Sequence, residues 1–180
     1  MVQTLELTSH PAFQPGQVTG VSVRWTELAD GRLMLRYRVD GANALVVPPF
    51  KGHGQADELW KSTCFELFLY DGEGRYREFN FSPSGQWALY SFAGYRNRQP
   101  GAVLRDHPEI KHEQGENMFV QTVFVDAAIL LGAERAALAA VVEEDAARPS
   151  YWALAHNGLQ PDFHDPFAFR IPLAQGGAGA

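Results

Sequence analysis

Apolar and polar residues alternate along most of the chain in short runs, which is the pattern of strands that bury one face. Residues 21–25 and 33–39 alternate in this way, and Asp30-Gly31 between them is typical of a hairpin turn. Further runs of strand length, separated by turn residues, span 64–70, 76–82, 87–92, 119–125, 137–143 and 151–156. The pattern predicts an antiparallel β-sandwich or barrel in a single domain over residues 1–173.

Some segments depart from this pattern. Residues 127–132, with Asp126 as N-cap, predict one short helical turn, so the expected fold is all-β with at most one short helix. Residues 174–180 are small and glycine-rich, and we expect a disordered tail there. Residues 48–57 and 92–107 are long and irregular, and they either carry binding residues or cross between the sheets.

The register of the central hairpin follows from the requirement that one face be apolar. Pairing Tyr70 with Tyr76 gives such a face, and a one-residue slip would bring a carboxylate into the core. Its apolar positions are Phe65, Leu67, Phe79 and Phe81. A three-residue loop at 83–85 adds the next strand, with Trp87 and Leu89 on the same face.

The opposite face of these three strands is polar. In the same register Glu66 pairs with Asn80, and Tyr90 lies beside Glu78. Carboxylate, amide and phenol groups on one face, beside an aromatic ring, are typical of sites that hydrogen-bond sugar hydroxyls. Antiparallel sheets also commonly leave a polar face to water, and the residue types alone allow this alternative.

Composition and charge exclude several classes of protein. The net charge is −6, and the excess acid lies in the last third, where we expect residues 143–145 to form a solvated turn. No basic stripe is present, so no nucleic-acid partner is expected. No apolar run is long enough to span a membrane and the first residues lack signal-peptide features, so we expect a cytoplasmic protein. The single cysteine, Cys64, excludes an internal disulfide and is expected to be a small half-buried filler.

Parts of the sequence resemble a known superfamily. Residues 57–69 and 76–85, with a Leu-Trp element, a Glu-Leu-Phe-Leu strand and a Glu-Phe strand, resemble DOMON domains and carbohydrate-binding modules of family 9. The likeness is closest to small bacterial DOMON-like proteins of unknown ligand. Residues 162–169 look like the closing strand of that group, and the resemblance covers 57–92 and, more loosely, 151–172. It implies an antiparallel two-sheet β-sandwich of jelly-roll type that binds a ligand and catalyses nothing.

The resemblance and the polar face together predict a ligand site for a saccharide or a sugar-containing metabolite. In the family-9 modules aromatic rings hold the end of a sugar chain while polar side chains hold its hydroxyls, and Trp60 stands where such a ring could project. The candidate ligand-binding residues are Trp60, Glu66, Glu78, Asn80 and Tyr90, with Arg36 and Arg38 as neighbours from another strand.

Two other functions are compatible with the sequence. Another branch of the superfamily binds haem through a methionine and a histidine, so Met34 or Met118 with one of six histidines would make a haem or redox module, although packing explains both methionines. The second alternative is a structural or oligomerising β-domain, for example a homodimer.

An enzyme and a metal site are not expected. Glu66 and Glu78 have the residue types of a glycosidase pair, but we expect arginines at 36, 38 or 77 to pair with them and leave their pKa values ordinary. The histidines lack the paired spacing of metal ligands. His164 is the histidine of interest, because it lies in the closing motif, where a hydrogen bond that holds the C-terminal part explains it as well.

Overall fold

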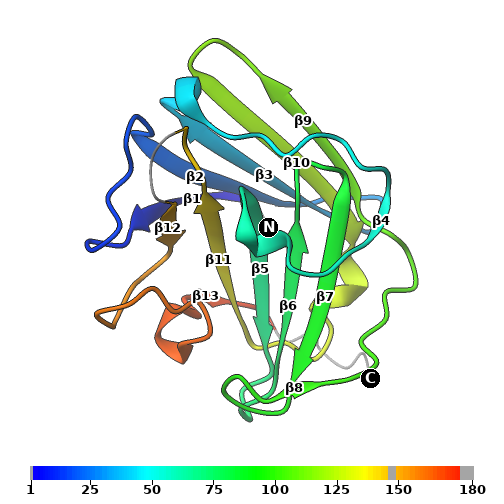
Figure 1. The fold of residues 1–180 in the computed structure, drawn as a ribbon. Helices are drawn as coiled ribbons and strands as arrows, with labels where there is room; N and C mark the ends of the chain where they lie inside the picture. The colour runs from blue at the N-terminus through cyan, green and yellow to red at the C-terminus, as the bar shows by residue number, and fades with distance from the viewer. Residues whose placement is uncertain (1, 146–148, 175–180) are drawn as a thin grey trace.

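The structure, a computed structural model, describes residues 2–145 and 149–174 and consists almost entirely of strands (Figure 1). The strands are β1 (Val2–Ser9), β2 (Gly20–Glu27), β3 (Arg32–Asp40), β4 (Gly54–Gln55), β5 (Cys64–Tyr70), β6 (Tyr76–Phe81), β7 (Gln86–Phe92), β8 (Arg98–Gln99), β9 (Glu109–Gln114), β10 (Met118–Asp126), β11 (Arg135–Val142), β12 (Ser150–Ala153) and β13 (Ile171–Pro172). The short 3-10 helices are η1 (Ala42–Ala44), η2 (Leu59–Lys61), η3 (Ala127–Leu130) and η4 (Pro166–Ala168). The all-β prediction is confirmed, and the predicted tail lies, apart from residue 174, outside the described residues.

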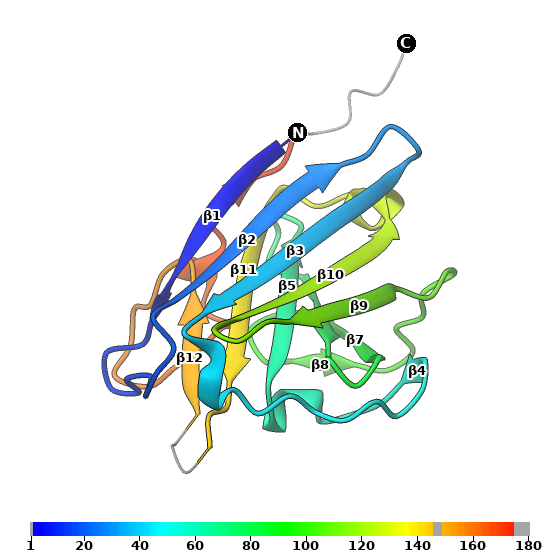
Figure 2. The same ribbon diagram turned by 90° about the horizontal axis from the view of Figure 1, so that it is seen from above.

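The strands form one curled sheet that makes a half-barrel. Their order is β4-β7-β6-β5-β11-β12-β1-β2-β3-β10-β9, with β8 attached to β7 and β13 to β11. Figure 2 shows the half from β1 to β9 lying across the half that contains β11, β5 and β7. Two separate antiparallel sheets are not found, because β1 pairs with β2 through residues 2–7 and with β12 through residues 8 and 9. The sheet is also mixed, since β4 runs parallel to β7.

The predicted strands are found, and the structure adds β1, β9 and the two-residue strands β4, β8 and β13. In β9 Ile110 alone is buried, so this edge strand lacks the alternation that marks the others. In β1 Leu7 alone is buried, so this strand also lacks a clear alternation of buried and exposed positions. The predicted helical turn is η3, and the Asp126 carboxylate accepts a hydrogen bond from the Ala128 N–H at 2.8 Å as an N-cap.

The central register agrees with the prediction. Tyr70 pairs with Tyr76, and the expected apolar pairs face the inside of the half-barrel. There they pack against the other half of the sheet, where the Tyr37 ring lies 4.9 Å from the Phe65 ring. Trp87 is buried in the same core, as expected for a three-residue loop.

The outer face of β5, β6 and β7 is covered by protein and is not left to water. Residues 154–170, called the C-terminal segment below and drawn in orange and red in Figure 1, pack against it. A second apolar cluster forms there, in which Phe169 lies 5.8 Å from the ring of Tyr76. Because this cover excludes water, the polar face becomes a buried environment for Glu66 and Asn80, which are 2% and 0% exposed.

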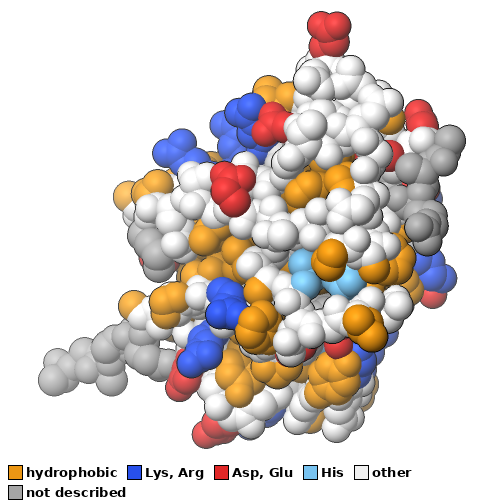
Figure 3. Space-filling view, turned by 90° about the vertical axis from the view of Figure 1, so that its left-hand side faces the viewer, with side chains coloured by type: hydrophobic (Ala, Val, Ile, Leu, Met, Phe, Trp, Pro, Cys, Tyr) orange, Lys and Arg blue, Asp and Glu red, His pale blue; other side chains and the backbone are white. Residues whose placement is uncertain are grey.

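Histidines attach the C-terminal segment to the start of the chain. The His156 ring nitrogen Nε2 lies 2.8 Å from the Thr8 carbonyl, and Nε2 of His10 lies 3.1 Å from the Gly158 carbonyl. The two rings contact each other edge to face at 4.9 Å. Figure 3 shows histidine side chains among apolar ones on this face. These contacts fix where the segment crosses the sheet.

The predicted solvated turn at 143–145 is wrong for Glu144, which is 3% exposed. Its carboxylate accepts hydrogen bonds from the backbone N–H groups of Gly16, Gln17 and Val18 at 2.7, 2.5 and 3.1 Å. The acid therefore satisfies the backbone of the loop between β1 and β2, which a charge count along the sequence does not show.

Replacing Glu144 by glutamine removes this charged acceptor and directs an amide toward N–H donors. We expect the Glu144→Gln variant to lose about 1–3 kcal/mol in free energy of unfolding, measured by urea denaturation. Glu113→Gln makes the same change on the exposed edge strand β9 and should change stability by less than about 0.5 kcal/mol. Equal stability of Glu144→Gln and the parent protein would contradict this role.

Candidate functional site

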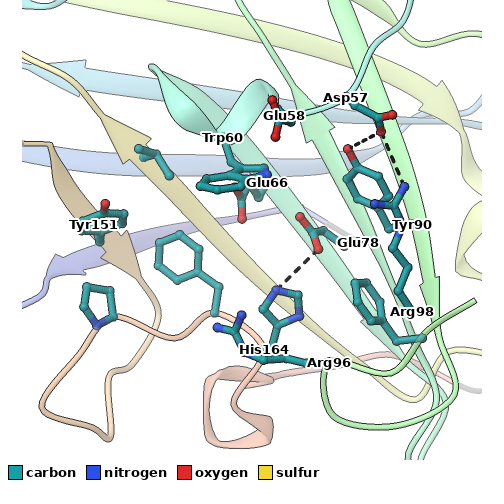
Figure 4. A pocket seen from close by; sticks show the side chains of 14 residues that line it. Asp57, Glu58, Trp60, Glu66, Glu78, Tyr90, Arg96, Arg98, Tyr151 and His164 are labelled. Carbon is teal, nitrogen blue, oxygen red and sulfur yellow. Dashed lines mark hydrogen bonds and ion pairs between the residues drawn. The ribbon is translucent and has the colours of Figure 1, made fainter.

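A cavity of about 670 Å³ lies on the outer face of β5, β6 and β7, beside the C-terminal segment (Figure 4). Its volume is within the range of roughly 300–1,000 Å³ that is typical of small-molecule sites. It is lined by Asp57, Glu58, Trp60, Glu66, Glu78, Tyr90, Phe92, Arg96, Arg98, Val141, Tyr151, Pro161, Phe163 and His164. These residues come from distant parts of the chain, so the tertiary structure assembles the cavity.

Two buried carboxyl groups, Glu66 on β5 and Glu78 on β6, point into the cavity (Figure 4). Because Glu66 pairs with Asn80, Glu78 is its diagonal neighbour, at a Cβ separation of about 7 Å. Burial raises the pKa of Glu66 well above its usual range, and the charge of Glu78 raises it further. Burial also raises the pKa of Glu78, against the Asn80 hydrogen bond and the charges of Arg98 and Arg96. The pair therefore favours a bound proton at neutral pH more than two separate, exposed carboxyl groups would.

The expected arginine partners do not reach these acids. Neighbouring positions on a strand face opposite sides, so Arg77 points away from Glu78 and donates to the Ile129 carbonyl at 2.6 Å. Arg36 and Arg38 belong to the other half of the half-barrel. The expectation of ordinary pKa values is therefore wrong, since each carboxyl group is buried without such a partner.

Asn80 and Cys64 lie beneath the carboxyl groups and do not line the cavity. The Asn80 amide donates to Oε1 of Glu78 at 2.7 Å, and its Oδ1 lies 3.7 Å from the Cys64 sulfur. Cys64 is fully buried, deeper than expected, and burial raises the pKa of its thiol well above the usual range. Asn80 thus holds Glu78 in place, and the thiol is a packing group.

A hydrogen-bonded chain approaches Glu78 from the other side. The backbone N–H of Arg96 donates to the Tyr76 hydroxyl at 2.9 Å, and that hydroxyl lies 2.9 Å from Nδ1 of His164. Burial lowers the pKa of His164 to about 4, and the charge of Arg96 contributes. A neutral ring that accepts from Tyr76 at Nδ1 carries its hydrogen on Nε2, which lies 3.7 Å from Oε2 of Glu78.

Tyr90 forms one side of the cavity. Its hydroxyl donates to Oδ1 of Asp57 at 2.9 Å, and the Arg98 guanidinium lies 4.0 Å from the centre of its ring. Burial and the Asp57 carboxylate raise the pKa of Tyr90 to about 12, so the phenol is un-ionised at neutral pH. Asp57 and Arg98 also form an ion pair at 3.5 Å. The polar groups on this side are therefore already paired.

Aromatic rings surround the carboxyl groups. Trp60 lies on η2 above Glu66 in Figure 4 and is 48% exposed, although it is one of the largest apolar side chains of the protein. Tyr151 and Phe163 line the cavity as well, with ring centres 6.2 Å apart. Flat apolar surfaces of this kind can pack against the C–H face of a sugar ring.

Two residues at the cavity have unusual backbone conformations. Glu58, just before η2, has φ of 61°, and Arg96, in the turn after β7, has φ of 54°. They are the non-glycine residues with positive φ in residues 2–145 and 149–174, and both line the cavity. Such conformations are costly without local support, and they are concentrated at functional sites.

The structure brings together part of the predicted site. Trp60, Glu66, Glu78 and Tyr90 line one cavity, whereas Asn80 lies behind Glu78. The remaining two, Arg36 and Arg38, are exposed, and Arg38 pairs with Asp40 at 2.8 Å. They alternate on β3 with buried residues that face the core, so their side chains point out of the half-barrel, away from the cavity.

Sequence reasoning missed several cavity residues. Asp57 and Arg96 lie in the irregular segments singled out from the sequence, and His164 lies in the closing motif, but nothing in the local pattern joins them. His164 does hold the C-terminal segment through its hydrogen bond to Tyr76, as one alternative expected. Tyr151 and Phe163 carried no signal beyond their apolar character.

The structure gives no support to the haem alternative, since neither Met34 nor Met118 lines the cavity. Within the described part of the chain, no group of three or more acidic, histidine or cysteine side chains is arranged to hold a metal ion. In the same residues no helix has the length and apolar character needed to cross a membrane.

The comparisons with known proteins support the fold. No protein-family model and no curated protein matches the chain. The chain is similar to the crystal structure of a "putative carbohydrate-binding protein" from Bacteroides uniformis, with a TM-score of 0.67 and 19% sequence identity. The match covers 93% of this chain and 84% of that one. At this identity the similarity shows a shared fold.

The buried His164 gives a prediction about pH. Its native pKa of about 4 lies below the unfolded value of about 6.5, so the unfolded state binds more protons and stability falls as pH drops below 6.5. Between pH 7 and 5 the histidine should remove about 2 kcal/mol of stability. We expect His164→Gln to lose less stability than the parent protein over this range, measured by urea denaturation. Titration of the His164 ring by NMR should give a pKa near 4, and a value near 6.5 would contradict the prediction.

Proposed function

We propose that the protein is a binding domain, without catalytic activity, for a saccharide or a sugar-containing metabolite in the cavity between the outer sheet face and the C-terminal segment. The observation that carries the proposal is the pair Glu66 and Glu78, two buried carboxyl groups that line a cavity beneath the ring of Trp60. Carboxyl groups bind hydroxyls, and an exposed indole packs against the face of a sugar ring.

The hydrogen-bonding state of the cavity supports this function. Asn80 occupies one oxygen of Glu78, whereas the carboxyl group of Glu66 makes no hydrogen bond to a described residue. The carboxyl group of Glu66 opens into the cavity, where a bound ligand can supply its hydrogen-bond donors. The positive φ of Glu58 and Arg96 is consistent with a cavity shaped for binding.

The similarity to solved structures is also consistent with this function. The Bacteroides "putative carbohydrate-binding protein" shares the fold over most of both chains. We infer that the present chain is a distant relative of the DOMON and family-9 modules, whose sugar sites also combine aromatic rings with polar side chains. The resemblance of residues 57–92 is the basis for this inference.

Trp60 should dominate the affinity. We expect Trp60→Ala to weaken binding of a sugar found in a thermal-shift screen by about tenfold or more, measured by isothermal titration calorimetry. Phe50→Ala removes another exposed ring, 65% exposed and outside the cavity, and should leave the affinity unchanged. If Trp60→Ala binds each retained sugar as tightly as the parent protein does, the site assignment is wrong.

The absence of catalysis can be tested on the same ligands. A retaining glycosidase needs one ionised and one protonated carboxyl group about 5–5.5 Å apart, and the pair at Glu66 and Glu78 has the right residue types. We expect no hydrolysis of chromogenic aryl glycosides or of the bound oligosaccharides. Turnover that Glu66→Gln and Glu78→Gln each abolish would make the protein a glycosidase.

A further inference from the structure

Around the cavity the basic side chains have acidic partners, but among the described residues the cavity's two buried glutamates have no arginine or lysine in contact. The cations nearest to it are paired with acids other than Glu66 and Glu78. Their pairs are Arg96 with Asp162 at 2.8 Å, Arg98 with Asp57 at 3.5 Å and Lys61 with Glu58 at 2.7 Å. In the described residues no arginine or lysine lies within ion-pair distance of either buried glutamate. His164 lies near Glu78, but its ring is neutral at pH 7.

Glu66 is a buried acid whose carboxyl group has no hydrogen-bond partner among the described residues. The residue is 2% exposed, and its carboxyl group lines the cavity. A buried acid of this kind must hold a proton or receive a cation. A neutral sugar would leave the pair Glu66 and Glu78 without a cation in contact, since Arg96 and Arg98 act on Glu78 from beyond ion-pair distance.

An ammonium group fits these side chains better than a hydroxyl does. It has three N–H donors and a positive charge, and hydrogen bonds from a charged donor to a carboxylate are the strong ones. The rings of Trp60, Tyr151 and Phe163 border the same space, and aromatic faces attract cations.

We propose that the ligand of this cavity is an amino sugar whose ammonium group binds between Glu66 and Glu78 beneath Trp60. This assignment rests on the proposed function and names its ligand class. The sugar ring packs against Trp60, and the ammonium group is the cation that contacts Glu66 and Glu78. The parent hexose has nearly the same shape but no charge, and an N-acetylated sugar is both larger and uncharged, so the cavity should discriminate against each of them.

Binding should release a proton. In the free protein the two carboxyl groups favour a shared proton, and a bound ammonium favours the doubly ionised pair. The titratable and charged groups that interact with the pair from neighbouring positions are Tyr37, Cys64, Tyr76, His164, Arg96 and Arg98. Tyr37, Cys64 and Tyr76 have raised pKa values and His164 a lowered one, so none of these four groups exchanges protons near pH 6.5.

The experiment is calorimetry at pH 6.5 with matched ligands. Glucosamine, galactosamine and mannosamine are each compared with the N-acetyl sugar and with the parent hexose. Cyclohexylamine serves as an amine without a sugar ring. Titration in two buffers of different ionisation enthalpy counts the released protons. We expect at least one amino sugar to bind about tenfold more tightly than its N-acetyl and parent forms, with proton release of up to about one.

The variants test the residues. Glu66→Gln should remove most of the preference for the amino sugar over the parent hexose, and with it the proton release. Glu73→Gln, the same change at an exposed turn residue outside the cavity, should leave both unchanged. Glu78→Gln is the second test if Glu66→Gln does not fold, and the ligand comparison on the parent protein needs no variant.

The possible results separate this inference from the proposed function. If neutral or N-acetylated sugars bind as tightly as the amino sugar, the amino-sugar assignment is overturned and sugar binding stands. If cyclohexylamine binds and no sugar does, both the sugar function and the amino-sugar assignment are overturned. If Glu66→Gln and Glu78→Gln both keep the full preference for the amino sugar, the placement of the ammonium is wrong.

Discussion

The cross-strand register of β5 and β6 decides which side chains enter the core and which reach the cavity. With Tyr70 opposite Tyr76, the phenylalanines face the inside of the half-barrel and Glu66 and Glu78 face outward. A shift of one residue would exchange the two faces and bury the carboxyl groups in the apolar core. The apolar core therefore permits one register of β5 and β6, and that register places both acids on the outer face, where the site forms.

Burial on the outer face gives these acids their unusual chemistry. The C-terminal segment covers this face and contributes His164, which contacts Tyr76 and lies near Glu78. A carboxyl group on an open sheet face would be ionised and hydrated, whereas burial raises the pKa of Glu66 and leaves it without a protein partner. The cost of burying such a group is the strongest physical reason to assign a ligand to the cavity.

The central strands and their faces could be predicted because they depend on local alternation. The residues that complete the site could not, since Asp57 and Arg96 lie in loops whose course has no period, and Tyr151 reaches the site through the pairing of β12 with β11. Arg36 and Arg38 were wrongly included in the site. Their strand was expected next to the polar face, but side-chain alternation on β3 points both arginines to the outside of the half-barrel. The burial of Glu144 could not be predicted from the sequence either, because its partners are backbone N–H groups far away in the chain.

The sequence by itself determined an all-β chain, the meander from β5 to β7 and the shared face of Glu66 and Glu78, because period-two alternation and turn residues act over a few positions. The tertiary structure alone decided that the strands join into one curled sheet, since β1 divides its hydrogen bonds between β2 and β12. It also decided that the C-terminal segment covers the polar face. That cover turns a surface that alternation would leave in water into a buried cavity, and burial sets the proton affinity of the acids within it.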